Sequence, residues 1–376
     1  MAAPLPRPVF EAEHELFRDN VRKFLQAEAA PYHHDWEKAG QVDKELWRKA
    51  GEQGFLAPQM PEEYGGFGVD FRYNAIVVEE ISRQFLSGIG WSLHSDIAVP
   101  YILNYGNEEQ KQKYIPGCVS GDIVTAIAMT EPGTGSDLQS VATTATLDGE
   151  EYVLNGSKTF ITNGQHADLV IVVAKTDTAA GAKGISLFLV EGGTPGFERG
   201  RNLEKLGMKA QDTSELFFRN CRIPKGNLLG KEGMGFAYLM HELAQERLSV
   251  ALGAVAVSEA ILEETVRYVQ ERKAFGKPIL AFQNTQFTLA ELDAEITASR
   301  AFVDRCLELH LDKKLDAVMA AKAKLVTTEL QGKVCDKCLQ LHGGYGFMWE
   351  FPVARAYADA RVQRIYAGTN EIMKLI

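Results

Sequence analysis

The spacing of hydrophobic residues changes twice along this chain, and that change limits the fold more than any other feature. In the first third, apolar residues recur at helical spacing in the segments 11–30, 43–56, 72–85 and 107–115. After Gly121 the chain consists of short β-branched runs separated by turn residues. Beyond Gly230 the helical spacing returns in three long segments, at about 235–272, 283–311 and 314–342.

The middle third predicts an antiparallel β domain. Its apolar runs are 123–129, 141–147, 152–154, 169–174, 185–190 and 216–218. Asp148-Gly149 and Asn155-Gly156 stand between such runs, and these dipeptides favour the tight turns of β-hairpins. We therefore expect a hairpin turn at each of the two dipeptides.

The chain of 376 residues is long enough for two or three domains. We expect an α+β protein with an N-terminal α-helical domain (1–121), a middle antiparallel β domain (122–228) and a C-terminal domain (229–376). Because the last three helical segments are long and closely connected, the C-terminal domain is predicted to be an antiparallel four-helix bundle.

Composition excludes several classes of protein. Binding nucleic acid requires a clustered positive surface on the protein, and the net charge of −10 argues against such a partner. Five scattered cysteines indicate a reducing compartment, and no apolar run is long enough for a membrane span. The first ten residues lack the features of a signal or transit peptide. A bacterial cytoplasmic location is favoured, with the mitochondrial matrix as the alternative if the chain is processed.

Two segments of the β domain contain groups suited to a planar, phosphate-bearing ligand. Residues 129–137 (Met-Thr-Glu-Pro-Gly-Thr-Gly-Ser-Asp) combine hydroxyls with glycine N–H groups, which bind phosphates or the edge of a heterocycle. Residues 158–164 (Lys-Thr-Phe-Ile-Thr-Asn-Gly) add an aromatic face and a further hydroxyl. Taken singly, the first segment is more typical of an ordinary turn than of a ligand site.

Three further segments lie in the helical C-terminal third. Residues 271–279 place Arg272 in an interhelix loop, where an arginine pairs with pyrophosphate or is merely solvated. Residues 340–347 end a helix with a glycine cluster that also fits a C-cap. Residues 365–372 contain Thr369, a suitable helix N-cap.

The five segments together, in this order and spacing, resemble the acyl-CoA dehydrogenase family of flavoproteins. The resemblance extends over the whole chain. Residues 245–248 (Gln-Glu-Arg-Leu), 348–350 (Met-Trp-Glu) and 365–374 resemble the long-chain members in particular. The family resemblance implies the acyl-CoA dehydrogenase fold, FAD as cofactor, and the oxidation of a fatty or branched acyl-CoA to the trans-2-enoyl-CoA in fatty-acid β-oxidation.

This chemistry requires a base for the weakly acidic α-proton. In many family members the base is a glutamate just before the Gly-Thr of the fifth segment, but that position is Ala367 here. Long-chain and isovaleryl-type members instead carry it on the first long C-terminal helix, next to an arginine, which matches Glu246 and Arg247. Glu246 is therefore the predicted base. The apolar neighbours of Glu246 are expected to raise its pKa.

The resemblance also implies the remaining site residues. It assigns the flavin half of the cofactor to Ile127, Met129, Thr130, Ser136, Phe160 and Thr162. It assigns the adenine dinucleotide half, across a subunit boundary, to Arg272, Phe275, Gln283, Gln340, Gly343 and Gly344, with Thr369, Asn370 and Glu371 completing the site. It assigns the acyl-CoA to Ser136, Lys183, Arg247, Ala367 and Gly368, the Ala367 N–H donating to the thioester carbonyl.

The implied partners are other copies of the chain, in a homotetramer, and an electron-transferring flavoprotein that accepts the electrons. Two alternatives are an acyl-CoA oxidase-like flavoenzyme and a catalytically silent scaffold that keeps FAD. Gly88 and Gly90 are expected to leave room for the acyl chain, and Trp91 and Leu93 to shorten that space. Cys335, Cys338 and His342 fit one helix face without a second ligand pair, so no metal site is predicted.

Overall fold

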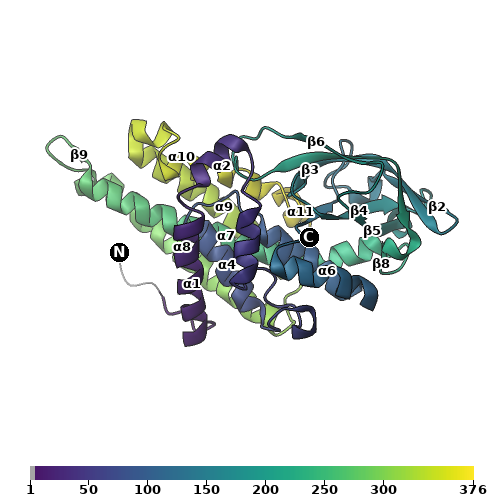
Figure 1. Cartoon of the computed structure of the whole chain (residues 1–376). Coiled ribbons are helices and arrows are strands. Elements are labelled where there is room, and N and C mark those ends of the chain that lie inside the picture. Colours follow the sequence, from purple (N-terminus) through teal and green to yellow (C-terminus); the bar gives the residue numbers. More distant parts are fainter. Residues whose placement is uncertain (1–4) are drawn as a thin grey trace.

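A computed structural model describes residues 5–376, and it confirms the predicted order of helical, β and helical regions (Figure 1). The first region contains α1 (Ala12–Glu28), α2 (His33–Ala39), α3 (Glu45–Glu52), α4 (Phe71–Arg83), α5 (Val99–Tyr105) and α6 (Glu108–Ser120). Asp70 caps α4 through its side chain, and Asn107 and Gln110 form a capping box on α6. Helices α2 and α5 were not expected from the sequence. A π-helical turn, Leu93–Ala98, leads directly into α5.

The middle region is a largely antiparallel sheet with strand order β6-β7-β3-β2-β4-β5-β8. Its strands are β1 (Thr125–Ala128), β2 (Thr144–Asp148), β3 (Glu151–Thr162), β4 (Leu169–Lys175), β5 (Ile185–Glu191), β6 (Phe197–Asn202), β7 (Thr213–Pro224) and β8 (Leu228–Leu229). Two pairings are parallel, because β4 runs alongside both β1 and β2.

Only one of the two predicted hairpin turns exists. Asp148-Gly149 joins β2 to β3, and Gly149 has the positive φ of 63° that such a turn requires. The turn predicted at Asn155-Gly156 is wrong, since both residues lie within β3. The pairing of β3 with β7 shifts register between Leu154 and Gly156, which marks a β-bulge. Bulges and turns favour the same residues, so the dipeptide does not distinguish them.

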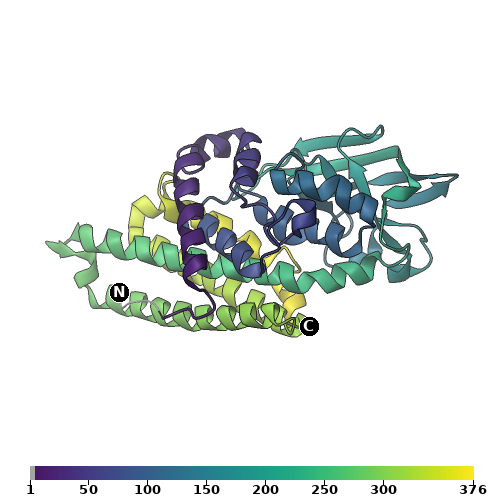
Figure 2. The same cartoon turned by 60° about the horizontal axis from the view of Figure 1, so that its bottom comes forward.

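The C-terminal region is built around three long helices, α7 (Gly235–Glu271), α8 (Gln283–Leu311) and α9 (Ala317–His342). The short strands β9 (Lys273–Ala274) and β10 (Lys277–Pro278) form a hairpin between α7 and α8, and Figure 2 shows these two helices side by side. The shorter α10 (Pro352–Ala360) packs on α7 and α9, and α11 (Asn370–Leu375) packs on α9. This arrangement is the predicted helical bundle.

Helix α7 connects the regions. Its middle residues, including Leu248 and Leu252, share one apolar core with α1 and α4. Farther along, Ile261 and Val269 share a second core with α8 and α9. At its beginning, Leu239 belongs to a third core that contains residues of β4 and β5. One helix therefore contributes to the packing of all three regions.

Gly88 and Gly90 lie where the N-terminal region meets the β domain. A Cβ at Gly88 would stand 2.3 Å from the Cβ of Ala210, and one at Gly90 would stand 2.0 Å from the side chain of Asn163. Trp91 is fully buried. The expectation that these glycines leave room for an acyl chain is therefore wrong: their lack of a side chain permits close contact between two domains.

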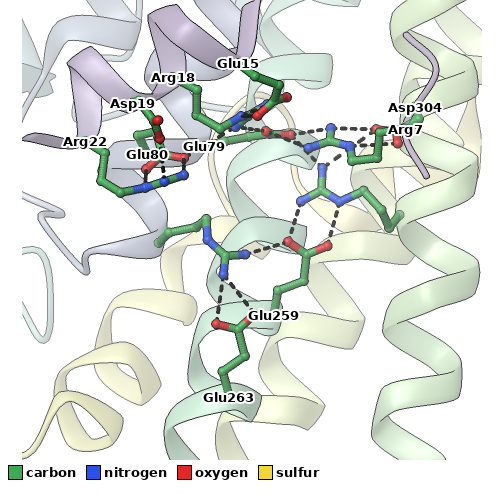
Figure 3. A network of polar contacts seen from close by, with 12 residues as sticks. Arg7, Glu15, Arg18, Asp19, Arg22, Glu79, Glu80, Glu259, Glu263 and Asp304 are labelled. Atoms are coloured by element: carbon green, nitrogen blue, oxygen red, sulfur yellow. Dashed lines mark hydrogen bonds and ion pairs between the residues drawn. The ribbon is translucent and has the colours of Figure 1, made fainter. Parts of the chain in front are cut away.

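A buried network of charges ties the N-terminal segment to the bundle (Figure 3). Its centre is Glu79 of α4, which accepts hydrogen bonds from Arg7, Arg18 and Arg300 at 2.7–2.9 Å. Burial acts to raise the pKa of Glu79, but the charges of the three arginines outweigh it and hold that pKa well below its usual value. The network continues outward through Glu80, Glu259 and their arginine partners.

No helix within residues 5–376 is long and apolar enough to cross a membrane. Over the same residues, His, Cys, Asp and Glu side chains do not gather in threes in a way that would hold a metal ion. Cys335, Cys338 and His342 are buried in the bundle.

We expect Glu79→Gln to destabilise the protein strongly, because it removes the carboxylate that contacts all three arginines. Breaking a buried ion pair from one side typically lowers the free energy of unfolding by ~3–5 kcal/mol. Urea unfolding at fixed protein concentration measures this change. Asp35→Asn, which breaks an exposed pair with Lys38, is the control and should leave the midpoint unchanged. Equal midpoints for both variants would contradict this account of the network.

Candidate active site

The predicted base, Glu246, is buried in the middle of α7 with 4% of its surface exposed. Tyr101 of α5 donates a hydrogen bond from its hydroxyl to Oε1 of Glu246 at 3.1 Å. Burial raises the pKa of Glu246 to about 7, while the Tyr101 hydrogen bond lowers it, the Glu242 carboxylate raises it, and the Arg247 charge lowers it. A carboxylate with this pKa is suited to accept a proton from carbon near neutral pH.

The loop with residues 365–369 lies beside this helix. Nε of Arg247 donates to the carbonyl oxygen of Ala367 at 3.3 Å. Lys324 of α9 donates to the carbonyl oxygen of Gly368 at 2.9 Å and to the side chain of Asn370 at 2.8 Å. Ala367 and Gly368 both have positive φ, at 52° and 87°. Two buried cations thus fix a strained backbone next to Glu246.

The predicted flavin residues lie on two segments of the β domain that meet at Thr130 and Thr159, and we call this region the flavin face. Thr130 and Thr162 are half-buried, Ser136 is exposed, and Phe160 exposes 67% of its surface. Thr159 donates from its N–H to the carbonyl oxygen of Thr130 at 3.0 Å, which joins the two motif segments. Ile127 and Met129 lie on and just beyond β1, close behind them.

A buried ion pair supports this face from within. Nζ of Lys158, which is 1% exposed, lies 2.8 Å from Oε1 of Glu131 and 3.1 Å from the carbonyl oxygen of Met129. Glu131 also accepts from the N–H groups of Ala142 and Thr143. The 129–137 segment is therefore anchored at its beginning, while Gly133 and Gly135 face open space where a Cβ would meet no atom within 4 Å.

The residues predicted for the adenine dinucleotide half lie at the opposite end of the molecule. Arg272, Gln340, Gly343 and Gly344 line a depression of about 650 Å³ near the β9–β10 hairpin. Figure 1 shows this hairpin and the β domain at opposite ends of the chain. Phe275 on the hairpin exposes 95% of its surface, and Gln283 begins α8 close by. A single chain does not bring these residues together with the flavin face.

The remaining predicted residues have distinct surroundings. Lys183 is exposed on a 3₁₀ turn, Gly181–Gly184, that packs near the end of the 129–137 segment. Thr369 caps α11 through its side chain, and Glu371 is exposed in the first turn of that helix. Asn370 is buried and bonded to Lys324 and Thr328, so its side chain anchors the loop.

The comparisons with known proteins agree over the whole length. Residues 11–122 match the family described as acyl-CoA dehydrogenase, N-terminal domain; residues 126–221 match the middle domain; residues 233–376 match the C-terminal domain. The chain belongs to the acyl-CoA dehydrogenase family. Its relatives include the mitochondrial long-chain specific acyl-CoA dehydrogenase of Sus scrofa, 56% identical over 370 residues, covering 98% of this chain and 86% of that protein.

Solved structures of the acyl-CoA dehydrogenase family share the fold. The crystal structure of an acyl-CoA dehydrogenase from Geobacillus kaustophilus has a TM-score of 0.97 and 51% identity, covering 98% of both chains. The structure of an acyl-CoA dehydrogenase complexed with FAD from Bacillus anthracis has a TM-score of 0.92 and 34% identity, covering 97% of this chain and 67% of that one.

Acyl-CoA dehydrogenases are FAD-dependent oxidoreductases, and the residues of this member fit that cofactor. The β-domain face offers an exposed aromatic ring at Phe160 and hydroxyls at Thr130 and Thr162. The open glycines Gly133 and Gly135 leave space for close backbone approach to a ligand. These are the groups that a planar heterocycle with polar edges requires.

Sequence reasoning did not identify the residues that hold this site in place. Tyr101 and Lys324 are distant in sequence from the groups they bind, and neither belongs to a recognisable motif. Lys158 and Glu131 each belong to one of the two motif segments of the β domain, but the motifs alone do not show that the two side chains meet. Glu242 lies one helical turn before Glu246, and that spacing is visible in the sequence.

We expect Lys158→Met to weaken FAD binding at least ~10-fold, because Glu131 is then buried without its cation and the 129–137 segment loses its anchor. Flavin fluorescence during equilibrium dialysis measures the affinity, and circular dichroism checks that the helices persist. Lys225→Met, at an exposed lysine of the same domain, is the control. Unchanged FAD affinity in Lys158→Met would show that the ion pair between Lys158 and Glu131 does not contribute to cofactor binding.

Proposed function

We propose that this chain catalyses the FAD-dependent α,β-dehydrogenation of a fatty or branched acyl-CoA thioester, with Glu246 as the base. The observation that carries the proposal is the carboxylate of Glu246: it is buried, its pKa is raised to about 7, and it lies on α7 beside the loop of Ala367. The family relationship supplies the reaction class.

The residues divide the work as follows. Glu246 accepts the α-proton of the acyl chain and becomes a neutral acid, which its apolar surroundings tolerate. The backbone N–H of Ala367 donates to the thioester carbonyl as negative charge develops on that oxygen. FAD, when bound, supplies the acceptor for the β-hydrogen, which leaves as hydride and completes the C=C bond.

Binding groups for the rest of the substrate lie nearby. Ser136 is exposed on the 129–137 segment, and Lys183 lies on the turn that packs against the residues just after that segment. We assign both to the CoA portion, where a hydroxyl and an ammonium meet phosphate and amide groups. Arg247 is buried and donates to the Ala367 carbonyl oxygen rather than reaching into solvent.

The cofactor is proposed to be shared between two copies of the chain. The separation of Arg272, Phe275 and Gln340 from the flavin face supports this, because one dinucleotide does not span both groups within a chain. We propose a homotetramer, and an electron-transferring flavoprotein as the acceptor for electrons from the reduced cofactor.

We expect Glu246→Gln to retain FAD but to slow flavin reduction by saturated acyl-CoAs at least ~10³-fold, because the amide cannot take the α-proton. Anaerobic stopped-flow bleaching of the flavin, with a panel of chain lengths, measures the rate. The control is Glu264→Gln, at a carboxylate on the same helix that pairs with Arg267 at the surface.

Near-normal reduction in Glu246→Gln would overturn the assignment. Glu131, Glu242 and Glu371 would then be the remaining candidates, although Glu131 is bound to Lys158 and Glu371 is exposed. Rapid peroxide formation in air would favour the oxidase alternative. A flavin spectrum insensitive to every acyl-CoA would favour the silent scaffold.

The pH dependence follows from the same carboxylate. The pKa of Glu246 is about 7 in the free protein, and only the ionised form acts as a base. We expect kcat/KM to be constant at high pH and to fall tenfold per pH unit below about pH 7, since this ratio reports ionisations of the free enzyme. A profile that stays flat down to pH 5 would contradict a base with a raised pKa.

A further inference from the structure

The base is held by a residue from a different domain. Tyr101 lies on α5 in the N-terminal region, and its hydroxyl is the only hydrogen-bond partner of the Glu246 carboxylate among residues 5–376. Tyr101 is fully buried, with its ring packed in the core shared by α5, α6 and the β domain. The contact therefore crosses from one domain to the active centre of another.

We propose that Tyr101 is a positioning residue that fixes and tunes the Glu246 carboxylate for proton abstraction. The proposal rests on the proposed function, in which Glu246 is the base. The Tyr101 hydroxyl occupies Oε1 of Glu246, which leaves Oε2 to face the substrate. A carboxylate held in one rotamer meets the α-carbon without a search among orientations.

The direction of this hydrogen bond is fixed by the environment. Burial and the charge of Glu246 hold the pKa of Tyr101 well above its usual value, so the phenol keeps its proton and donates it. A donated hydrogen bond stabilises the charged carboxylate more than the neutral acid. Tyr101 therefore opposes the effect of burial and keeps a larger fraction of Glu246 ionised at neutral pH.

Helix α5 holds a second carboxylate of α7 in the same way. Glu242 lies one turn before Glu246 and is also buried. It accepts from the Tyr105 hydroxyl at 2.7 Å and from the Asn104 side chain at 3.0 Å. Tyr101 and Tyr105, four residues apart on α5, thus meet Glu246 and Glu242, four residues apart on α7.

The two neighbours act on Glu246 with opposite signs. The negative charge of Glu242 makes ionisation of Glu246 harder and strengthens it as a base, whereas the Tyr101 hydroxyl makes ionisation easier. The other charged group facing Glu246 is Arg247, which is bonded to the Ala367 carbonyl.

Three titratable groups lie just beyond this pair. Lys324 of α9 faces Arg247 and binds the loop. Nδ1 of His241 lies 3.2 Å from Oε1 of Glu242. The half-buried His310 of α8 has a pKa lowered to about 4 by desolvation, so it is neutral at the pH of the test.

The experiment compares kcat/KM from pH 5.5 to 9 in the FAD-loaded enzyme carrying Tyr101→Phe or Glu242→Gln. In Tyr101→Phe the acidic limb should move up by about 0.5–1 pH unit, because the carboxylate loses its donor. Flavin reduction at pH 7 should slow ~2–5-fold, with the deficit shrinking toward pH 9. In Glu242→Gln the limb should move down, since the repelling charge is gone.

The matched control is Tyr114→Phe. Tyr114 is another buried tyrosine of the N-terminal region, and its hydroxyl donates to Glu191 in the β domain at 2.9 Å. Its limb should coincide with that of the unmodified enzyme. Flavin content and thermal unfolding of each variant confirm that the site is intact before the profiles are compared.

The double variant Tyr101→Phe with Glu246→Gln adds a test of mechanism. If Tyr101 acts through Glu246, removing its hydroxyl should not slow the double variant beyond Glu246→Gln alone. An additive loss would overturn the proposal, because Tyr101 would then act by another route. So would an unmoved limb in Tyr101→Phe, or a shift in the same direction in Tyr101→Phe and Glu242→Gln.

These results separate the two proposals. Normal flavin reduction in Glu246→Gln removes the base assignment, and the positioning role falls with it. A strong loss in Glu246→Gln together with an unmoved limb in Tyr101→Phe removes only the positioning role.

Discussion

Helix α7 is the constraint on which the rest of the structure depends. Its 37 residues extend about 55 Å, from the β domain to the β9–β10 hairpin. Apolar side chains surround it on several sides and enter three separate cores, through residues such as Leu239, Leu252 and Ile261. Much of the helix is therefore buried. Its buried carboxylates Glu242 and Glu246 must be paired with groups from another element, and α5 supplies their donors.

Two buried glutamates, Glu79 and Glu246, have opposite electrostatic surroundings. Glu79 of α4 is surrounded by three arginines, which hold its pKa well below its usual value and make it a permanent charge. Within the part of the chain that the structure describes, Glu246 of α7 accepts a single hydrogen bond, from the Tyr101 phenol, and burial raises its pKa to about 7. A permanent anion stabilises a domain contact, whereas a carboxylate that gains and loses a proton near neutral pH is suited to catalysis. The same residue type serves both purposes because the number of nearby cations differs.

The sequence predicts those features that depend on neighbouring residues. Helical spacing located α1, α4 and the three long helices of the bundle, and Asp148-Gly149 marked a real turn. The turn predicted at Asn155-Gly156 is wrong because the backbone geometry there depends on pairing with β7, some 60 residues later in the chain.

The residues of the candidate site also differ in whether the sequence could predict their contacts. Resemblance to the family pointed to Glu246 and to the motif residues on the β domain. It did not reveal that Tyr101 binds Glu246 or that Lys324 fixes the loop, because those contacts join elements whose proximity is set only by the packing of α7. The role expected for Gly88 is wrong for the same reason, because Gly88 packs closely against Ala210, which is far away in sequence.

With the proposed base on α7 rather than in the 365–369 loop, the two elements have different tasks. With alanine at 367, the loop has to present only its backbone, and Arg247 and Lys324 hold that backbone by its carbonyl oxygens. The carboxylate then depends on a helix that is rigid along its own axis but whose partner, Tyr101, belongs to another domain. Any change in how α5 meets α7 alters the hydrogen bond to Glu246 before it alters the loop. If Glu246 is the base, as proposed, the N-terminal helical region takes part in the acid–base chemistry through the Tyr101 hydroxyl as well as in the scaffold.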